Sequence, residues 1–120
     1  MQLEARKYLF DIRQACDLLA EFTAGKSLAD YAADAMMRSA VERQFEIAGE
    51  ALTKLLKAEP SLASAITDSK RIISFRNRLI HGYATISNEL VWGIVEKNLP
   101  VLHREVAQLL ATDTDRGPVK

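Results

Sequence analysis

Apolar residues recur at three- and four-residue steps along almost the whole chain, and this repeat constrains the fold more than any other feature. In the first 24 residues the repeat forms one helical stripe of Leu9, Ile12, Cys16, Leu19 and Phe22. There is no clear two-residue alternation, and the chain contains only 5 glycines and 3 prolines. The sequence therefore predicts an all-α fold, and its short connections favour an antiparallel four-helix bundle.

Capping residues mark where these helices begin and end. The expected helices span residues 3–24, 27–58, 69–80 and 88–111. Gly25 and Gly82 follow the first and third helices, where glycine adopts the left-handed backbone of a helix end at little cost. Ser27 and Ser87 stand where a hydroxyl can accept a free backbone N–H, and Asp30 extends the first of these caps to a capping box.

A proline and a polar end characterise the last part of the chain. Pro100 lies inside the fourth expected helix and should kink it or divide it into two segments. Residues 112–120 are polar and include Gly117 and Pro118, so we expect a flexible C-terminal tail there. Residues 1–111 then form one helical domain. Because a chain of 120 residues buries only a modest core, we expect a homodimer.

Composition narrows the classes of function. The chain has 16 basic and 16 acidic residues, so the overall charge argues neither for nor against nucleic-acid binding, and any such site must be a local patch. Cys16, the single cysteine, is expected to be a core side chain in a reducing cytoplasm. No apolar run approaches the ~18 residues of a membrane span, and we expect neither a signal peptide nor membrane contact. No metal-ligand cluster occurs, so no metal is expected, and no glycine-rich phosphate loop occurs, which argues against an NTPase. No nucleotidyltransferase signature occurs either, and we expect no cofactor.

The segment expected as the third helix carries the residues of chemical interest. On a helical wheel its apolar side holds Ile72, Ile73, Phe75, Leu79 and Ile80, and its polar side holds Lys70, Ser74, Asn77 and His81. Arg76 falls in the middle of the apolar side. Because a guanidinium keeps its charge, burying it without a partner is costly. Arg76 therefore needs a carboxylate or an anionic ligand.

The second expected helix offers carboxylates for this arginine. Glu42, Glu46 and Glu50 fall on one stripe at four-residue steps, which is either a solvated face or a polar wall beside a reactive site. Glu46 and Glu50 are the candidate partners of Arg76. In the purely structural alternative, the arginine forms a buried salt bridge or extends its charged end to solvent.

His81 stands at the end of the third helix. Histidine titrates near neutrality, as general acid–base catalysis on a ribose hydroxyl requires, but a histidine at this position is also a common structural cap. His103, the other histidine, is expected to be a surface or packing residue. Arg76 and His81 point about 140° apart on an ideal helix. They meet if the arginine swings round, if the helix ends early, or if two such helices face each other across a dyad. The dyad explains most, because an interface can hold apolar contacts and a phosphate-accepting cleft together.

The spacing Arg76-Asn77-x-x-x-His81 resembles the arginine–x4–histidine motif of the HEPN superfamily of helical RNases. Tyr83 extends it to the form found in HepT-like ribonuclease toxins of type VII toxin–antitoxin systems. The flanking residues 40–44, 47–51, 91–92 and 99–102 also look like that branch. The resemblance covers roughly residues 1–111.

This resemblance implies a HEPN-like homodimer with the motif at an interface cleft. It also implies metal-independent RNA cleavage, in which the ribose 2′-hydroxyl attacks the adjacent phosphate. His81 is then the acid–base group, Arg76 binds the phosphate, and Asn77 orients the histidine or a phosphate oxygen. Tyr83 is similar to the tyrosine that an MntA-like nucleotidyltransferase antitoxin modifies with AMP, which would block RNA by bulk and by charge.

Lys70, Arg71 and Arg78 make the same segment basic, and they are candidate contacts of RNA phosphates. The sequence thus predicts a cytoplasmic toxin endoribonuclease whose partners are RNA, a second copy and a nucleotidyltransferase antitoxin. The alternative is a non-catalytic helical dimer that uses the same cleft to bind a nucleotide or a partner. A bundle without any site is a third interpretation, and it must explain Arg76 on the apolar side.

Overall fold

The computed structural model describes residues 1–82 and 86–115, and this part of the chain contains helices and no strand. The elements are α1 (Leu3–Thr23), α2 (Leu28–Ala33), α3 (Ala35–Ala58), a 3-10 helix η1 (Pro60–Ala65), α4 (Ser69–His81) and α5 (Asn88–Asp115). The predicted all-α class is confirmed. Within the described residues, none of the helices combines the length and the apolar character needed to cross a lipid bilayer.

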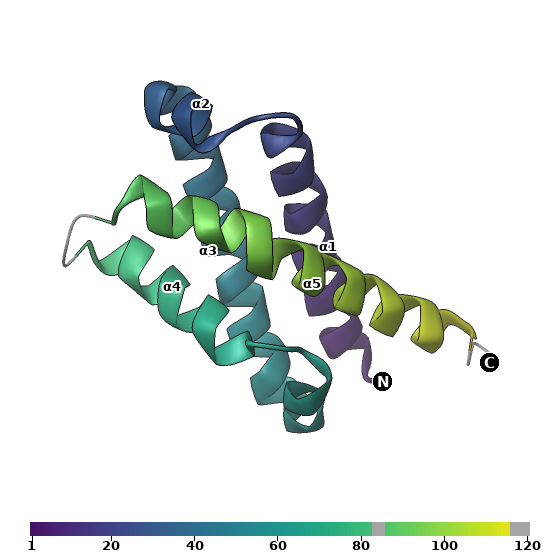
Figure 1. The fold of residues 1–120 in the computed structure, drawn as a ribbon. Helices are drawn as coiled ribbons and strands as arrows, with labels where there is room; N and C mark the ends of the chain where they lie inside the picture. Colours follow the sequence, from purple (N-terminus) through teal and green to yellow (C-terminus); the bar gives the residue numbers. More distant parts are fainter. Residues whose placement is uncertain (83–85, 116–120) are drawn as a thin grey trace.

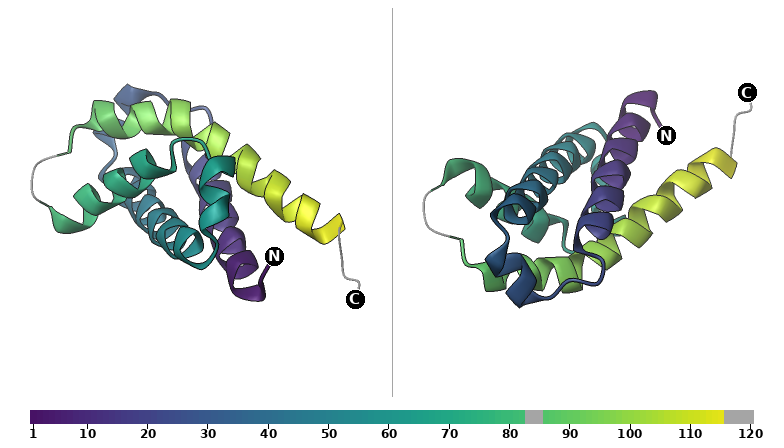
Figure 2. Two further views of the ribbon diagram at one scale, coloured as in Figure 1. Left: turned by 90° about the horizontal axis from the view of Figure 1, so that it is seen from below. Right: turned by 90° about the horizontal axis from the view of Figure 1, so that it is seen from above.

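α1 and α3 lie side by side and run in opposite directions, and α4 and α5 each cross this pair (Figure 1). α4 packs on α3, and α5 packs on α1 and the short α2. The C-terminal part of α5 extends beyond the other helices in both views of Figure 2. Because α4 rests on α3, the side chains at that crossing decide where the residues of α4 point.

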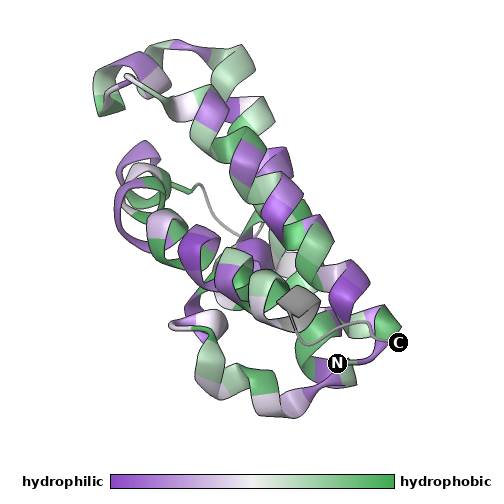
Figure 3. Cartoon of the chain, turned by 90° about the vertical axis from the view of Figure 1, so that its right-hand side faces the viewer, coloured by the Kyte–Doolittle hydropathy of each residue, from purple (hydrophilic) through white to green (hydrophobic). Residues whose placement is uncertain are grey.

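Apolar and polar residues share every helix (Figure 3), and the apolar ones meet in one core. Tyr31 of α2 packs on Trp92 of α5 with ring centroids 5.5 Å apart. Phe45 of α3 meets Phe75 of α4 edge to face, with centroids 5.2 Å apart and an interplanar angle of 84°. The second contact joins the two helices that carry the residues of interest.

Cys16 is fully buried in this core, which confirms its prediction as a core side chain. Burial, with a smaller contribution from the Asp17 charge, raises the pKa of the Cys16 thiol to about 12. The thiol is therefore protonated at neutral pH and is not a nucleophile.

The prediction of one continuous helix over residues 27–58 is wrong, because the structure has two helices there, α2 and α3. The chain turns at Asp34, between α2 and α3, with φ −121° and ψ 99°. The Asp34 carboxylate accepts a hydrogen bond from the Met37 N–H at 3.1 Å, and the Arg38 guanidinium donates to the Tyr31 carbonyl at 3.3 Å. A short acidic side chain that captures a free N–H competes with helix continuation, and apolar periodicity does not reveal that competition.

α5 runs unbroken through Pro100, so the predicted division of this helix is wrong. Proline cannot donate a hydrogen bond to the Glu96 carbonyl, but both residues are exposed, so this carbonyl lies on the solvent side. α5 also extends to Asp115 rather than ending near Ala111, because no glycine or proline lies between Ala111 and Gly117. Residues 112–115 of the predicted tail are therefore helical, and residues 116–120 lie outside the described residues.

The caps predicted at Ser27, Ser87, Gly25 and Gly82 are confirmed. Ser27 Oγ accepts from the Asp30 N–H at 3.2 Å, and the Asp30 carboxylate accepts from the Ser27 N–H at 2.9 Å, which completes the capping box. The Ser87 hydroxyl caps α5. Gly25 and Gly82 have φ values of 71° and 61°, the left-handed backbone expected after α1 and α4.

Phe45→Ala is expected to lower the free energy of unfolding by about 3–5 kcal/mol, because it removes a buried ring from the α3–α4 contact. The matched control is Phe10→Ala, which removes the same side chain where the residue is 60% exposed. The control should change the free energy of unfolding by about 0.5 kcal/mol or less. Urea unfolding followed by circular dichroism measures both, and equal losses would contradict this account of the core.

Candidate functional site

α4 is a strongly basic helix. Its 13 residues include four cationic side chains and one histidine, with no carboxylate. Lys70, Arg71 and Arg78 are exposed, whereas the side chain of Arg76 is only 19% exposed. In a chain of zero net charge, this helix supplies a local patch of the kind that anion binding requires.

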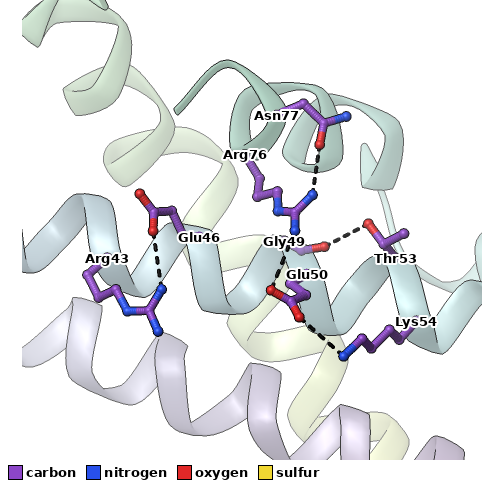
Figure 4. A network of polar contacts seen from close by, with 8 residues as sticks. All are labelled: Arg43, Glu46, Gly49, Glu50, Thr53, Lys54, Arg76 and Asn77. Atoms are coloured by element: carbon purple, nitrogen blue, oxygen red, sulfur yellow. Dashed lines mark hydrogen bonds and ion pairs between the residues drawn. The ribbon is translucent and has the colours of Figure 1, made fainter. Parts of the chain in front are cut away.

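Arg76 lies where α4 crosses α3, above Gly49 (Figure 4). Its methylene groups pack directly on Gly49, which is itself buried in α3. The guanidinium extends beyond the glycine along the α3 surface. An arginine on the apolar side of its helix is accommodated in this way, because the stem packs on the glycine while the terminal nitrogens reach polar partners.

Two polar side chains hold the terminal nitrogens of Arg76. Nη1 donates a hydrogen bond to Asn77 Oδ1 at 3.0 Å, and Nη2 donates to Glu50 Oε1 at 3.4 Å (Figure 4). Nε is buried and has no hydrogen-bond partner in the described part of the chain. The Glu50 side chain is 54% exposed, so water screens this ion pair and it stabilises the fold by about 1 kcal/mol at most. Such a pair is weak enough for a phosphate to replace the carboxylate.

The two candidate carboxylate partners of Arg76 have different neighbours. Glu50 lies beside Arg76, whereas Glu46 accepts from Arg43 at 3.2 Å. Glu50 also contacts Lys54 at 3.2 Å, one turn further along α3 (Figure 4). One carboxylate of the α3 stripe therefore contacts Arg76, and that carboxylate is shared with a lysine.

The pKa values along this stripe shift in opposite directions. The hydrogen bond from Lys54, then the charges of Lys54 and Arg76, hold the pKa of the Glu50 carboxyl below its ordinary value. Burial, helped by the Glu46 charge, raises the pKa of Glu42. The neighbours of Glu50 thus favour its charged form, whereas burial disfavours the charged form of Glu42.

His81 is the last residue of α4, and it is exposed. The helix closes when the Gly82 N–H donates to the Arg78 carbonyl at 3.2 Å. α4 is helical from Arg76 to His81, and Arg76 is directed toward α3, so the two side chains leave the helix on different sides. In one copy, neither an early helix end nor a swung arginine brings them together. Tyr83 lies outside the described residues.

A pocket of about 170 Å³ opens between α4 and α5. It is lined by Arg71, Ser74, Phe75, Arg78, Leu90 and Ile94. No carboxylate lines this pocket, whereas the larger pocket of about 230 Å³ between α1 and α3 contains both Asp11 and Glu50. Two arginines, a serine and three apolar residues thus line the α4–α5 pocket.

His103 has a partner on another helix. Its Nε2 lies 2.6 Å from Asp17 Oδ1, so the pair joins α5 to α1. The sequence did not reveal this partner, because the two residues are far apart in the chain. Among the residues that the structure describes, no group of three or more histidine, cysteine, aspartate or glutamate side chains is arranged to hold a metal ion.

The chain matches a family of known proteins, described as Ribonuclease HepT-like, over residues 12–109. The chain belongs to the HepT-like ribonuclease family. This confirms the resemblance to the HEPN superfamily that the sequence motif indicated. No solved structure matches the chain.

Two curated relatives illustrate this HepT-like membership. A protein of Caldanaerobacter subterraneus subsp. tengcongensis, named as a candidate RNase, is 33% identical over 105 residues, which cover 88% of this chain and 93% of the relative. A Thermococcus cleftensis protein named "Probable ribonuclease HepT" is 29% identical over 109 residues, which cover 91% and 98% of the two chains. The similarity therefore extends over nearly the whole length of each relative.

Gly49 has a role in this HepT-like site that the sequence analysis did not predict, because it appears there only within residues 47–51, as part of the resemblance. A glycine in the middle of a helix destabilises it by about 0.5–1 kcal/mol relative to alanine, and that cost was the available signal. This cost indicates that Gly49 has a close neighbour but not which residue that is, because Arg76 reaches Gly49 only where the two helices cross.

Glu50→Gln is expected to lower stability at neutral pH and to change it little in acid. A group whose folded-state pKa is lowered stabilises the fold above its unfolded-state pKa, and the stabilisation is lost as the pH falls through the folded-state value. Urea unfolding at about pH 7 and about pH 2, on either side of the carboxyl range, measures this dependence. Glu21→Gln on exposed α1 is the control, and a loss at Glu50 of equal size at both pH values would contradict the assignment.

Proposed function

We propose that this HepT-like chain is a toxin endoribonuclease that acts in the cytoplasm and cleaves RNA without a metal ion. The observation that carries the proposal is the arginine fork at the α3–α4 crossing, where an exposed carboxylate and Asn77 hold the terminal nitrogens of Arg76. A planar pair of N–H donors matches two oxygens of a phosphate. Because the family is one of ribonucleases, RNA is the phosphodiester to test first.

The proposed reaction is a transesterification within RNA. The ribose 2′-oxygen attacks the adjacent phosphorus and the 5′-oxygen of the next nucleotide leaves, which gives a 2′,3′-cyclic phosphate and a 5′-hydroxyl. His81 moves the proton to or from these oxygens, and Arg76 stabilises the charge that develops on the non-bridging oxygens. Asn77 holds Nη1 through its carbonyl oxygen, so its amide N–H groups remain for a phosphate oxygen or the histidine.

The proposed site needs two copies of the chain. In one copy Arg76 is directed toward α3 while His81 is exposed at the end of α4. A dyad between two α4 helices would place the arginine of one copy beside the histidine of the other. This arrangement supports a homodimer in which neither copy is complete alone.

The exposed cations of α4 are the proposed contacts of the RNA backbone. Arg71 and Arg78 lie seven residues apart on one side of α4, roughly 10 Å along the helix axis, with Ser74 between them. They border the pocket that lacks carboxylates, and Lys70 extends the same basic surface. Phosphates held here would keep an RNA strand on the exposed side of the helix that ends at His81.

Tyr83 is the proposed point of control. It follows His81 by two residues in the sequence. A cognate nucleotidyltransferase antitoxin would transfer AMP to its phenol oxygen, and the added negative charge and bulk would exclude RNA from the cleft.

A second candidate function is a non-catalytic dimer that binds a nucleotide or a partner. The observation that favours it is the pairing of Arg76, both of whose terminal nitrogens have protein partners in a single copy. In this alternative Glu50 and Asn77 fix the arginine as a structural group, and the cleft only binds. RNA cleavage by the purified protein separates the two functions.

Purified protein is expected to cleave RNA in the presence of EDTA and to leave 2′,3′-cyclic phosphate ends. Arg76→Ala and His81→Ala should each lower kcat by roughly 10²–10⁴-fold while the protein remains folded. The first variant removes the charge that binds the phosphate, and the second removes the acid–base group. A fluorescent RNA assay and mass spectrometry of the product ends measure both effects.

The matched controls are Arg104→Ala and His103→Ala, which remove the same side chains from α5. Both should retain cleavage. Expression of wild type and His81→Ala in cells without a partner should arrest growth only with wild type. A folded wild-type dimer that neither cleaves RNA nor arrests growth would favour the binding module.

Tyr83→Phe is expected to keep its ribonuclease activity and to escape control by the antitoxin, because it lacks the phenol oxygen that accepts AMP. Co-expression with the nucleotidyltransferase, followed by intact-mass measurement, should show a gain of one or more AMP groups in wild type and in Tyr8→Phe but none in Tyr83→Phe. Loss of cleavage in unmodified Tyr83→Phe would instead place the tyrosine in the chemistry.

A further inference from the structure

Gly49 lies in the middle of α3, where α4 crosses it, and it is buried there. Glycine weakens a helix relative to alanine, so a buried mid-helix glycine points to a close approach by another part of the chain. The approaching group is Arg76, whose Cβ, Cγ and Cδ are the nearest atoms to the place that a Gly49 side chain would occupy.

The available space excludes even a methyl group. A Cβ built on Gly49 would lie 2.5 Å from Arg76 Cγ and 3.4 Å from Arg76 Cδ, and closer still to Arg76 Cβ. Arg76 Cβ is fixed to the α4 backbone, so rotation of the arginine side chain cannot relieve that contact. Either α4 must move away from α3, or the helix must turn so that the stem leaves the crossing.

Either movement would displace the charged end of the arginine. Glu50, the residue directly after Gly49, accepts from Nη2, and Nε is buried beside the same turn of α3. The slot that seats the stem and the carboxylate that contacts the fork are therefore adjacent residues of one helix. A shift of α4 changes the distance from the fork to Glu50 and exposes Nε.

We propose that Gly49 is a positioning residue of the site: its missing side chain forms the slot that seats the Arg76 stem and so sets where the guanidinium meets phosphate. The catalytic part of this inference rests on the proposed ribonuclease function. Its structural part, the dependence of the Arg76 position on Gly49, stands apart from that function and is measured separately.

Gly93 supplies a matched control. It also lies inside a long helix, α5, but a Cβ added there would meet nothing within 4 Å. Gly49→Ala and Gly93→Ala thus make the same chemical change, and both raise intrinsic helix propensity. Only the first change places a methyl group against Arg76.

The position of Arg76 is read from its Nε–H signal in nitrogen-15 NMR spectra of the full chain. The signal is assigned by its disappearance in Arg76→Lys. In wild type and in Gly93→Ala, the buried Nε–H should exchange with water more slowly than that of exposed Arg104. In Gly49→Ala this protection should be lost while the circular dichroism spectrum stays helical. Protection that persists in Gly49→Ala would overturn the inference.

Cleavage tests the catalytic part. Gly49→Ala should lower kcat by roughly 100-fold, the effect expected when a catalytic group is misplaced by about 1 Å, and Gly93→Ala should leave kcat unchanged. In an Arg76→Ala background, Gly49→Ala should cause no further loss, because the group it displaces is already gone. An additive loss in the double variant would show that Gly49 acts only through general stability and would overturn the positioning role.

The two parts fail in different ways. If wild type does not cleave RNA, the proposed function fails, and the NMR measurement still decides whether Gly49 seats Arg76. If wild type cleaves RNA and Gly49→Ala retains full kcat with an unprotected Nε–H, the ribonuclease stands and the positioning role of Gly49 is wrong.

Discussion

The contact between the Arg76 stem and the Gly49 backbone is the packing interaction on which the position of this arginine depends. It resolves the conflict of a charged residue on the apolar side of a helix, because the methylene groups take the buried position and the fork does not. It also sets how closely α4 approaches α3, together with the edge-to-face contact of Phe45 and Phe75 one turn earlier on α3. Packing and electrostatics are therefore decided at the same crossing.

Because of that crossing, the two sides of α4 carry different groups of polar residues. On the side toward α3, Arg76 lies among a glycine, an amide and a carboxylate. On the side toward α5, Arg71 and Arg78 border a pocket without a carboxylate. On one side of α4, Arg76 is held beside a carboxylate that a phosphate could replace. On the other side, the exposed Arg71 and Arg78 could contact a chain of phosphates. This separation is what lets a chain of zero net charge present a binding surface for RNA under the proposed function.

Sequence patterns predict local features of this structure well and contacts between helices poorly. The capping box of Ser27 and Asp30 could be predicted, because it depends on residues that are close in the sequence. The helix ends at Gly25 and Gly82 could be predicted for the same reason. The break at Asp34 was missed, since whether an aspartate caps a new helix or sits within one depends on the turn it makes in space. For the same reason the helical wheel placed Arg76 on the apolar side and the glutamate stripe offered Glu46 and Glu50 as its partners, but only the packed helices show that Glu50 is the one in contact. The part of the site that no pattern predicted is the slot at Gly49, which exists only where two helices cross.

The five-residue spacing of Arg76 and His81 is itself an argument about assembly. Residues three or four apart share one side of a helix, so a site built on a single helix would use that spacing. A spacing of five turns the second side chain about 140° away from the first. In this fold the arginine is directed toward its own α3, and the histidine is exposed at the helix end. A motif with this spacing suits the proposed homodimer, in which each bundle would hold its own arginine and would place its histidine beside the arginine of the second copy.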